Sequence, residues 1–317
     1  MMAGSEGTPE MWAGMRLATV VEEGLSGPAP DSVVEGLDGF THRYADVNGT
    51  RIHYVLGGKG PAVVLVHGFP FTWQVWREVM PLLAERGYTV LAPDLRGMGD
   101  SAPAENDTFA KTNVAVDIHQ IVQSLGLGPI NLVGMDIGGM VAYAYASRNP
   151  SEVRRLVLSE TLIPGFGVEE MSNPATGGYW TFGFQSQVDL ATFLTLGKEE
   201  PFLTPFYRMT SAKPEGEAYG LATYLPSFTG PLGIRGGFQH YGPLFEDGKA
   251  NREALTDKLP MPVLVLNGDV GISQQPLLDG ARQVAENVES DYIPQASHTY
   301  AYDNPTATAD RLLRFFA

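Results

Sequence analysis

Residues 130–139 read Ile130-Asn131-Leu132-Val133-Gly134-Met135-Asp136-Ile137-Gly138-Gly139, and this stretch decides the fold. The apolar run before Gly134 predicts a buried strand, and the small residues after it predict a tight turn into a helix. Such a turn crowds the backbone, so its flanking residues must be small, and Gly134 and Gly138 meet this requirement. The pattern small-x-nucleophile-x-small is that of a nucleophile elbow, with Asp136 in the position of the nucleophile.

A carboxylate at the nucleophile position indicates a particular chemistry. It can attack an sp3 carbon and form an alkyl ester, whereas acyl transfer to a carboxylate would produce a high-energy anhydride. The presence of Asp136 instead of a serine therefore favours the opening of epoxides or carbon–halogen bonds over esterase or peptidase activity.

The composition narrows the class of protein. A formal net charge of -15 disfavours nucleic acid and anionic membranes as partners, because both repel an acidic surface. The chain has no Cys, which excludes disulfides and thiolate zinc sites. Its six His are dispersed and no phosphate-binding glycine loop is present, so neither a metal nor an organic cofactor is expected.

Hydropathy gives an expectation about location. No apolar run approaches the roughly 20 residues that span a bilayer, and the first residues lack the apolar core of a signal peptide. We therefore expect a cytoplasmic protein, although a mature secreted form would have the same composition.

Strand-like and helical segments alternate through most of the chain. This alternation predicts an α/β protein with a mostly parallel sheet covered on both faces, and Asn48-Gly49 predicts a hairpin between the first two strands. The expected strands are 44–47, 51–55, 62–66, 89–92, 130–133, 156–158, 263–266 and 291–293, and the expected helices are 73–86, 112–125, 138–147, 277–287 and a last helix that ends at 316.

Two regions depart from the alternation. Residues 1–40 contain the Gly, Pro and acidic residues typical of an N-terminal extension. Residues 163–250 contain 15 aromatic residues, which predicts a helical insertion between two core segments, 41–162 and 251–317. The aromatic residues would either wall an apolar pocket over the sheet or form the insertion's own core.

Further motifs lie where the predicted strands end. His67-Gly68-Phe69-Pro70 follows the third strand, residues 94–101 follow the fourth, and His298 follows the last. With the nucleophile first and the His last, residues 41–317 resemble the α/β-hydrolase fold. The resemblance implies a mostly parallel, eight-stranded sheet flanked by helices, with a helical cap inserted after strand 6.

The resemblance assigns roles around Asp136. Asp136 would attack the substrate, and His298 would then activate a water that hydrolyses the Asp136 ester. The backbone N–H groups of Phe69 and Ile137 would form the oxyanion hole. His67, at the substrate side of the same loop, is expected to organise the turn more than to take part in the chemistry.

A second acid must orient His298, and the sequence offers two candidates. Glu160 ends the sixth strand, and Asp269 follows the seventh. In this fold the acid commonly lies after the seventh strand, at the position of Gly271 in this chain, so Asp269 is two positions early. We favour Glu160 and keep Asp269 as the alternative.

Residues 153–160 narrow the resemblance to the bacterial Cif-type epoxide hydrolases, which place a Glu acid after the sixth strand. The resemblance implies that Tyr241 donates a proton to the epoxide oxygen, since a phenol stays protonated near neutral pH. These enzymes pair that Tyr with a His or a second Tyr, where this chain has Thr181. The resemblance also suggests a homodimer. The other residues that could supply the second donor are Tyr179, Trp180 and His240.

Two other functions compete with hydrolysis of a hydrophobic or aromatic epoxide. A haloalkane or haloacid dehalogenase would use the same triad, but Phe69 and Ile137 offer no side-chain N–H to a departing halide. A non-catalytic α/β-hydrolase-like binding protein is the second alternative. Such proteins often lack part of the triad, whereas Asp136, His298 and an acid are all present here. In each case the expected partner is a small molecule.

Overall fold

A single sheet forms the centre of the computed structural model, which describes residues 27–103 and 108–317. Its strands, in chain order, are β1 (Phe40–Val47), β2 (Thr50–Gly58), β3 (Ala62–Val66), β4 (Thr89–Pro93), β5 (Ile130–Met135), β6 (Val153–Ser159), β7 (Val263–Gly268) and β8 (Val288–Ile293). Their spatial order is β1-β2-β4-β3-β5-β6-β7-β8. β2 runs antiparallel to β1 and β4, and the other pairs are parallel.

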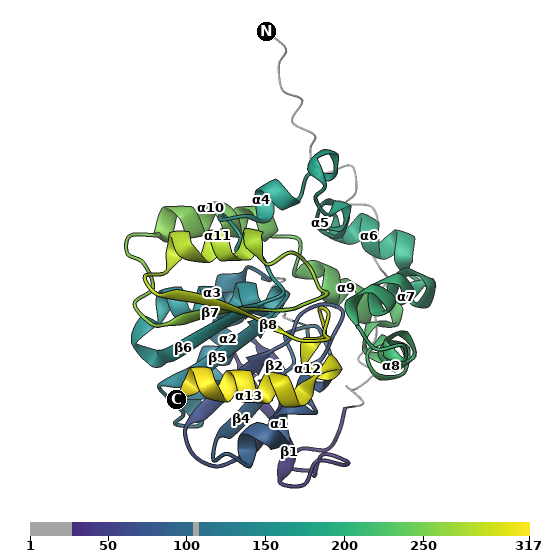
Figure 1. Cartoon of the computed structure of the whole chain (residues 1–317). Helices are drawn as coiled ribbons and strands as arrows, with labels where there is room; N and C mark the ends of the chain where they lie inside the picture. Colours follow the sequence, from purple (N-terminus) through teal and green to yellow (C-terminus); the bar gives the residue numbers. More distant parts are fainter. Residues whose placement is uncertain (1–26, 104–107) are drawn as a thin grey trace.

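Helices cover both faces of this sheet (Figure 1). Helix α1 packs against α13, and α2 packs against α3. The helices of the core are α1 (Val79–Ala84), α2 (Lys111–Ser124), α3 (Ile137–Arg148), α11 (Gln275–Val284), α12 (Tyr300–Asp303) and α13 (Pro305–Phe316), with short 3-10 helices at Trp73–Trp76 and Pro150–Glu152. The predicted α/β class and the mostly parallel eight-stranded sheet are confirmed.

Three strands inside the sheet are buried along their whole length, as their apolar sequences predict. Every residue of β3, β5 and β7 is buried, as expected for parallel strands covered on both faces. The hairpin between β1 and β2 turns at Asn48 and Gly49, whose φ angles are 47° and 72°. Two successive positive φ angles are what a two-residue turn of this hand requires, which explains the Asn-Gly pair.

The helix predicted over Trp73–Arg86 is wrong as a continuous element. The chain forms a 3-10 helix at Trp73–Trp76 and begins α1 only at Val79. Pro81 accounts for the interruption, because its ring would collide with the carbonyl group of Arg77 in an unbroken helix. Starting α1 at Val79 places Pro81 in the first turn, where its missing N–H costs nothing.

The region predicted as an N-terminal extension is partly packed on the core. Residues 1–26 lie outside the described residues, but Val34 and Leu37 are buried against the sheet. Val33 forms a β-bridge with Thr41, and the hydroxyl group of Tyr44 donates a hydrogen bond to the carbonyl oxygen of Pro28. The described part of the extension is therefore integrated into the fold.

The helical insertion lies between β6 and β7, as predicted. In Figure 1 its helices α5 to α9 gather beside the sheet. The predicted boundary at residue 250 falls inside α10. The insertion's helices are α4 (Val168–Met171), α5 (Trp180–Gln185), α6 (Val188–Thr195), α7 (Glu199–Thr210), α8 (Gly216–Thr223), α9 (Gly230–Gln239) and α10 (Leu244–Ala254), with 3-10 helices at Pro174–Thr176 and Leu225–Phe228.

Across residues 27–103 and 108–317, none of the helices has the length and apolar character that crossing a membrane would require.

Candidate active site

Asp136 occupies a strained turn between β5 and α3. Its φ of 55° and ψ of -128° lie outside the usual regions for a residue with a side chain. The glycines around it are required by space: a Cβ on Gly134 would lie 2.3 Å from the carbonyl oxygen of Gly138, and one on Gly138 would lie 2.3 Å from that of Val66. The turn holds the carboxylate of Asp136 at the carboxyl end of the sheet.

His298 and Glu160 complete a row of three ionisable side chains. His298 Nε2 lies 3.6 Å from Asp136 Oδ2, and His298 Nδ1 lies 3.2 Å from Glu160 Oε2. Glu160 is buried, and its other oxygen accepts a hydrogen bond of 2.8 Å from the backbone N–H of Gly268. The imidazole is therefore held between the two carboxylates, one on each ring nitrogen.

Asp269, the alternative acid, has a different set of contacts. It is exposed, and its carboxylate accepts a 3.1 Å hydrogen bond from the backbone N–H of Ala296. Hydrogen bonds from the backbone of Gln295 and Ala296 lower the pKa of Asp269. Its carboxylate closes the loop that leads to His298 but makes no described contact with the imidazole.

The missing side chain of Gly271 explains why Glu160, directly after β6, can reach His298. A Cβ at Gly271 would lie 2.6 Å from Glu160 Oε1, so the carboxylate of Glu160 occupies space that a side chain at 271 would need. Glu160 itself has a positive φ of 47°, which directs its side chain from the end of β6 toward this space. The carboxylate of Glu160 can therefore take this position only because residue 271 has no side chain.

The two carboxylates control the protonation of His298. Burial alone would lower its pKa, but hydrogen bonds and charge from Asp136 and Glu160 outweigh burial and raise the pKa to about 10. His298 is therefore a cation near neutral pH.

The loop after β3 contributes a backbone donor to Asp136. The N–H of Phe69 donates a 3.0 Å hydrogen bond to Asp136 Oδ1. The approach requires Gly68, because a Cβ there would lie 2.3 Å from the same oxygen. Ile137 begins α3, so its N–H is one of the helix donors without an intrahelical acceptor. Thr161, which the sequence analysis did not select, donates a 2.6 Å hydrogen bond to the backbone carbonyl of Asp136.

His67 supports this loop and has no nitrogen left for a substrate. Its Nδ1–H donates to the carbonyl of Gly68 at 2.9 Å, and its Nε2 accepts from the N–H of Leu95 at 3.0 Å. Burial lowers the pKa of His67, and a neutral ring fits both bonds. Because the ring of His67 is neutral, the 3.5 Å contact between His67 Nε2 and Asp94 Oδ1 is not an ion pair.

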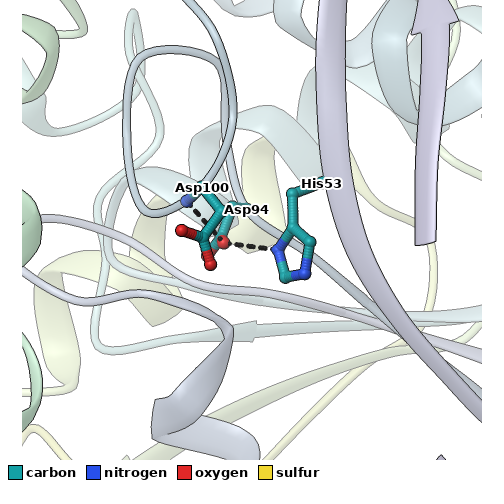
Figure 2. Close-up of side chains that lie close together, drawn as sticks. All are labelled: His53, Asp94 and Asp100. Atoms are coloured by element: carbon teal, nitrogen blue, oxygen red, sulfur yellow. Dashed lines mark hydrogen bonds and ion pairs between the residues drawn. The ribbon is translucent and has the colours of Figure 1, made fainter. Parts of the chain in front are cut away.

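A buried carboxylate on the next loop was also missed by sequence reasoning. Asp94 accepts hydrogen bonds from His53 Nδ1 at 2.8 Å and from the N–H of Asp100 at 3.1 Å (Figure 2). It also accepts one from the N–H of Trp73 at 2.8 Å. Among the described residues, His53, Asp94 and Asp100 are the group whose spacing suits a metal ion. Their mutual hydrogen bonds already satisfy Asp94, so we assign the group a structural role in holding the loops after β3 and β4.

Tyr241 lies in the turn between α9 and α10 and packs beside Phe69, whose N–H binds Asp136. It is buried, and its ring packs edge to face on Phe69 with centroids 5.9 Å apart. Burial and the charge of Asp136 raise the pKa of Tyr241 well above its usual value. Burial and the charge of Glu160 also raise the pKa of Tyr179, so the charges of Asp136 and Glu160 influence both phenols.

The other sequence-predicted donors differ in position. Trp180 is 58 % exposed and packs on Phe184, and Thr181 is partly buried in α5. The ring of His240 is fully buried, and its Nε2 lies 2.9 Å from the carbonyl oxygen of Arg96. The structure therefore does not bring the imidazole of His240 to Asp136, because this hydrogen bond directs the ring into the core.

Aromatic side chains of the insertion meet the core at Phe69. Phe228 and Phe238 lie with centroids 5.2 Å and 5.7 Å from that ring. Phe238 also packs on Phe184 and Phe202 within the insertion. Of the two roles left open for these aromatic residues, the structure shows the insertion's own core, one edge of which packs on Phe69.

Comparison with known proteins identifies a matching family and similar relatives. The family described as alpha/beta hydrolase fold matches residues 61–269. The chain is similar to a soluble epoxide hydrolase of Corynebacterium sp. (strain C12), with 33% identity over 88% of this chain and 98% of that one. It is also similar to a fluoroacetate dehalogenase of Burkholderia sp, with 34% identity over 47% of this chain and 50% of that one.

A solved structure extends the likeness to three dimensions. The Cif epoxide hydrolase from Acinetobacter nosocomialis superposes with a TM-score of 0.82 at 25% sequence identity, and the match covers 89% of this chain and 90% of that one.

The raised pKa of His298 predicts a pH dependence of stability. Because the folded pKa of about 10 exceeds the ordinary value of 6.5, the contribution of His298 is fully present below pH 6.5 and is lost as the pH rises through about 10. A shift of this size corresponds to a contribution on the order of a few kcal/mol. Denaturant unfolding of the wild type and His298→Gln across this window should show a steeper loss for the wild type. Parallel curves would contradict the assignment.

Proposed function

The chain belongs to the epoxide hydrolases of the α/β-hydrolase fold family, and we propose that it converts an epoxide to a vicinal diol through a covalent ester on Asp136. The observation that carries the proposal is the imidazole of His298 between Asp136 and Glu160, at 3.6 Å and 3.2 Å. A nucleophilic carboxylate, a base and an orienting acid are the three groups that formation and hydrolysis of an alkyl ester require.

In the first step the carboxylate of Asp136 attacks an epoxide carbon. A carbon–oxygen bond forms at the enzyme, the ring carbon–oxygen bond breaks, and the ring oxygen leaves as an alkoxide. Tyr241 donates a proton to that oxygen, since its raised pKa keeps the phenol protonated until a stronger base forms beside it. For the second donor we prefer Tyr179 to Trp180. The charge of Glu160 contributes to the raised pKa of the Tyr179 phenol, whereas Trp180 is exposed.

In the second step the Asp136 ester is hydrolysed. His298 takes a proton from water, and the resulting hydroxide attacks the carbonyl carbon of the ester. The backbone N–H groups of Phe69 and Ile137 stabilise the negative charge that develops on the carbonyl oxygen. Phe69 N–H already bonds an oxygen of the free carboxylate at 3.0 Å. Collapse of the intermediate releases the diol and restores the carboxylate.

The protonation of His298 alternates through this cycle. In the free enzyme the charge of Asp136 helps to hold the proton on the imidazole. Ester formation neutralises that carboxylate, so the pKa of His298 falls and its proton can replace the one that Tyr241 gives to the alkoxide. The neutral imidazole is then the base for water, and ester hydrolysis returns both the carboxylate and the proton.

Epoxide hydrolysis fits the site better than dehalogenation does. Phe69 and Ile137 offer only backbone N–H groups beside Asp136, whereas Tyr241 offers an acidic proton where an alkoxide would form. The aromatic surroundings of Phe69, formed by Phe228, Phe238 and Tyr241, favour a hydrophobic or aromatic epoxide.

We also propose the organisation in which this chemistry occurs. The insertion at 163–250 would serve as the cap over the core segments 41–162 and 251–317, with 1–40 as an N-terminal segment. A homodimer is the assembly that the family resemblance suggests, and a cytoplasmic location is the one that the hydropathy favours.

We expect a covalent adduct on Asp136 when ester hydrolysis is blocked. His298→Gln protein, incubated with a panel of epoxides and haloalkanes, should gain the whole mass of an epoxide by intact-mass spectrometry. Asp136→Asn in the same background should gain none. An alkyl adduct from a haloalkane alone would indicate a dehalogenase, and no adduct with any compound would favour the binding-protein alternative.

The choice of acid can be tested with two amide substitutions. Glu160→Gln should reduce turnover roughly 100-fold or more, because the amide cannot stabilise the imidazolium form of His298. Asp269→Asn keeps an oxygen for the N–H of Ala296 and should change turnover less than about threefold. Steady-state rates on the substrate that gives the adduct would decide, and a larger loss in Asp269→Asn would reverse the assignment.

A further inference from the structure

The turn that carries Tyr241 is attached to the core by a buried polar cluster. Tyr241 lies between the end of α9 at Gln239 and the start of α10 at Leu244. Two backbone hydrogen bonds shape the turn, from Tyr241 N–H to the carbonyl of Phe238 at 2.8 Å and from Leu244 N–H to the carbonyl of Tyr241 at 3.1 Å. Both are local, so contacts from the core must determine where the turn sits relative to Asp136.

Lys111 supplies one of these contacts. It is the first residue of α2, is 1 % exposed, and its ammonium donates hydrogen bonds to the backbone carbonyl of His240 and to Asp247 Oδ2, the latter at 3.2 Å. The carbonyl group belongs to His240, the residue directly before Tyr241. The core helix α2 is therefore hydrogen-bonded to the cap backbone at the residue directly before Tyr241, the proposed proton donor.

Asp247 makes the burial of this ammonium tolerable. Its carboxylate pairs with the Lys111 side chain and also accepts a 3.1 Å hydrogen bond from the Lys111 backbone N–H. The residue before α2 is Ala110, which has no side chain to cap the helix. Asp247, from α10 in the cap, thus caps α2 in the core, and it offsets the cost of a buried charge.

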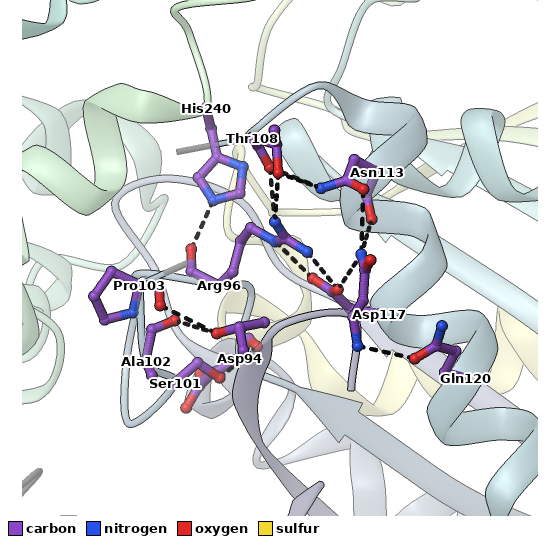
Figure 3. A network of polar contacts seen from close by, with 12 residues as sticks. Asp94, Arg96, Ser101, Ala102, Pro103, Thr108, Asn113, Asp117, Gln120 and His240 are labelled. Atoms are coloured by element: carbon purple, nitrogen blue, oxygen red, sulfur yellow. Dashed lines mark hydrogen bonds and ion pairs between the residues drawn. The ribbon is translucent and has the colours of Figure 1, made fainter. Parts of the chain in front are cut away.

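The side chain of His240 forms the second contact with the core. Its Nε2–H donates to the carbonyl of Arg96, whose guanidinium pairs with Asp117 at 2.8 Å and 2.5 Å (Figure 3). Burial and the Lys111 charge lower the pKa of His240 well below its usual value. A neutral ring with Nε2 protonated fits the single bond, and it leaves Nδ1 as a buried acceptor without a partner.

We infer that Lys111 is a positioning residue for epoxide opening: through its hydrogen bond to the His240 carbonyl it holds the Tyr241 phenol where the alkoxide forms. The inference rests on the proposed function of Asp136 and Tyr241. It assigns Lys111 to the first step alone, because hydrolysis of the ester depends on His298 and the Phe69 loop. Removing the ammonium should slow ester formation and leave the pH dependence of ester hydrolysis unchanged.

The test uses a pair of variants that differ only at residue 111. Asp247→Asn keeps an oxygen for the N–H of residue 111 and leaves the side chain of Lys111 bonded to His240. Lys111→Met/Asp247→Asn removes both charges, keeps the cap of α2 and loses the bond to the carbonyl. Neither variant leaves a buried carboxylate without a partner, but Asp247→Asn leaves the Lys111 ammonium with neutral acceptors only. Thermal melting must therefore show that both variants are folded before their rates are compared.

Ester formation is measured in the His298→Gln background, by the rate at which the epoxide adduct appears. Asp247→Asn should form adduct within about threefold of the parent, and the double variant should be slower by roughly tenfold or more, since a displaced proton donor loses its alignment. Adding Tyr241→Phe to each should then erase the difference between them, because Lys111 acts through Tyr241.

Each contrary result has a defined meaning. Equal rates for the two variants, or a Lys111 effect that persists in full with Tyr241→Phe, would overturn the inference and leave only a structural ion pair. A loss in Asp247→Asn as large as that in the double variant would overturn it as well. If the His298→Gln parent forms no adduct, the proposed function itself fails and this inference fails with it.

Discussion

The arrangement of the active site depends on the backbone of one residue, Asp136, which occupies a φ of 55° between a buried strand and a helix. That conformation is costly for a residue with a side chain, and the surrounding structure must hold it. Gly68, Gly134 and Gly138 make this possible, because a Cβ on any of them would come within 2.3 Å of a neighbouring oxygen. The same crowding brings the N–H of Phe69 to the carboxylate. The strained turn at Asp136 and the hydrogen bond from Phe69 therefore have a single origin.

Charge balance is the second constraint on the site. One imidazole lies between two carboxylates, and this arrangement raises the pKa of His298 to about 10. The orienting acid reaches His298 from the end of β6, where Glu160 fills the space left free by the missing side chain of Gly271. A change at residue 271 would thus affect catalysis without touching the substrate.

The cap is joined to the core by close backbone contact and by buried polar groups as well as by aromatic packing. A Cβ on Gly236 of α9 would lie 1.9 Å from the carbonyl oxygen of Gly97, so the cap helix and the loop after β4 meet backbone to backbone. Beside this contact, Lys111 and Asp247 pair across the boundary. Directional hydrogen bonds of this kind define one orientation of α9 and α10 more sharply than apolar contacts do. Such precision is what a proton donor in the cap requires.

The sequence by itself determined the features that arise from local sterics and periodicity. The elbow at Asp136, the Asn48-Gly49 hairpin and the buried strands follow from neighbouring residues, so a single chain was enough to predict them. The break at Pro81 has a local cause too, but the helical periodicity of the segment concealed it. Tertiary structure decided the rest. Local sequence favoured Glu160 as the acid but left Asp269 as an alternative, and in the structure the His298 ring faces Glu160. Lys111 and Asp247 lie on helices far apart along the chain, and only the packing of the cap on the core brings their side chains together.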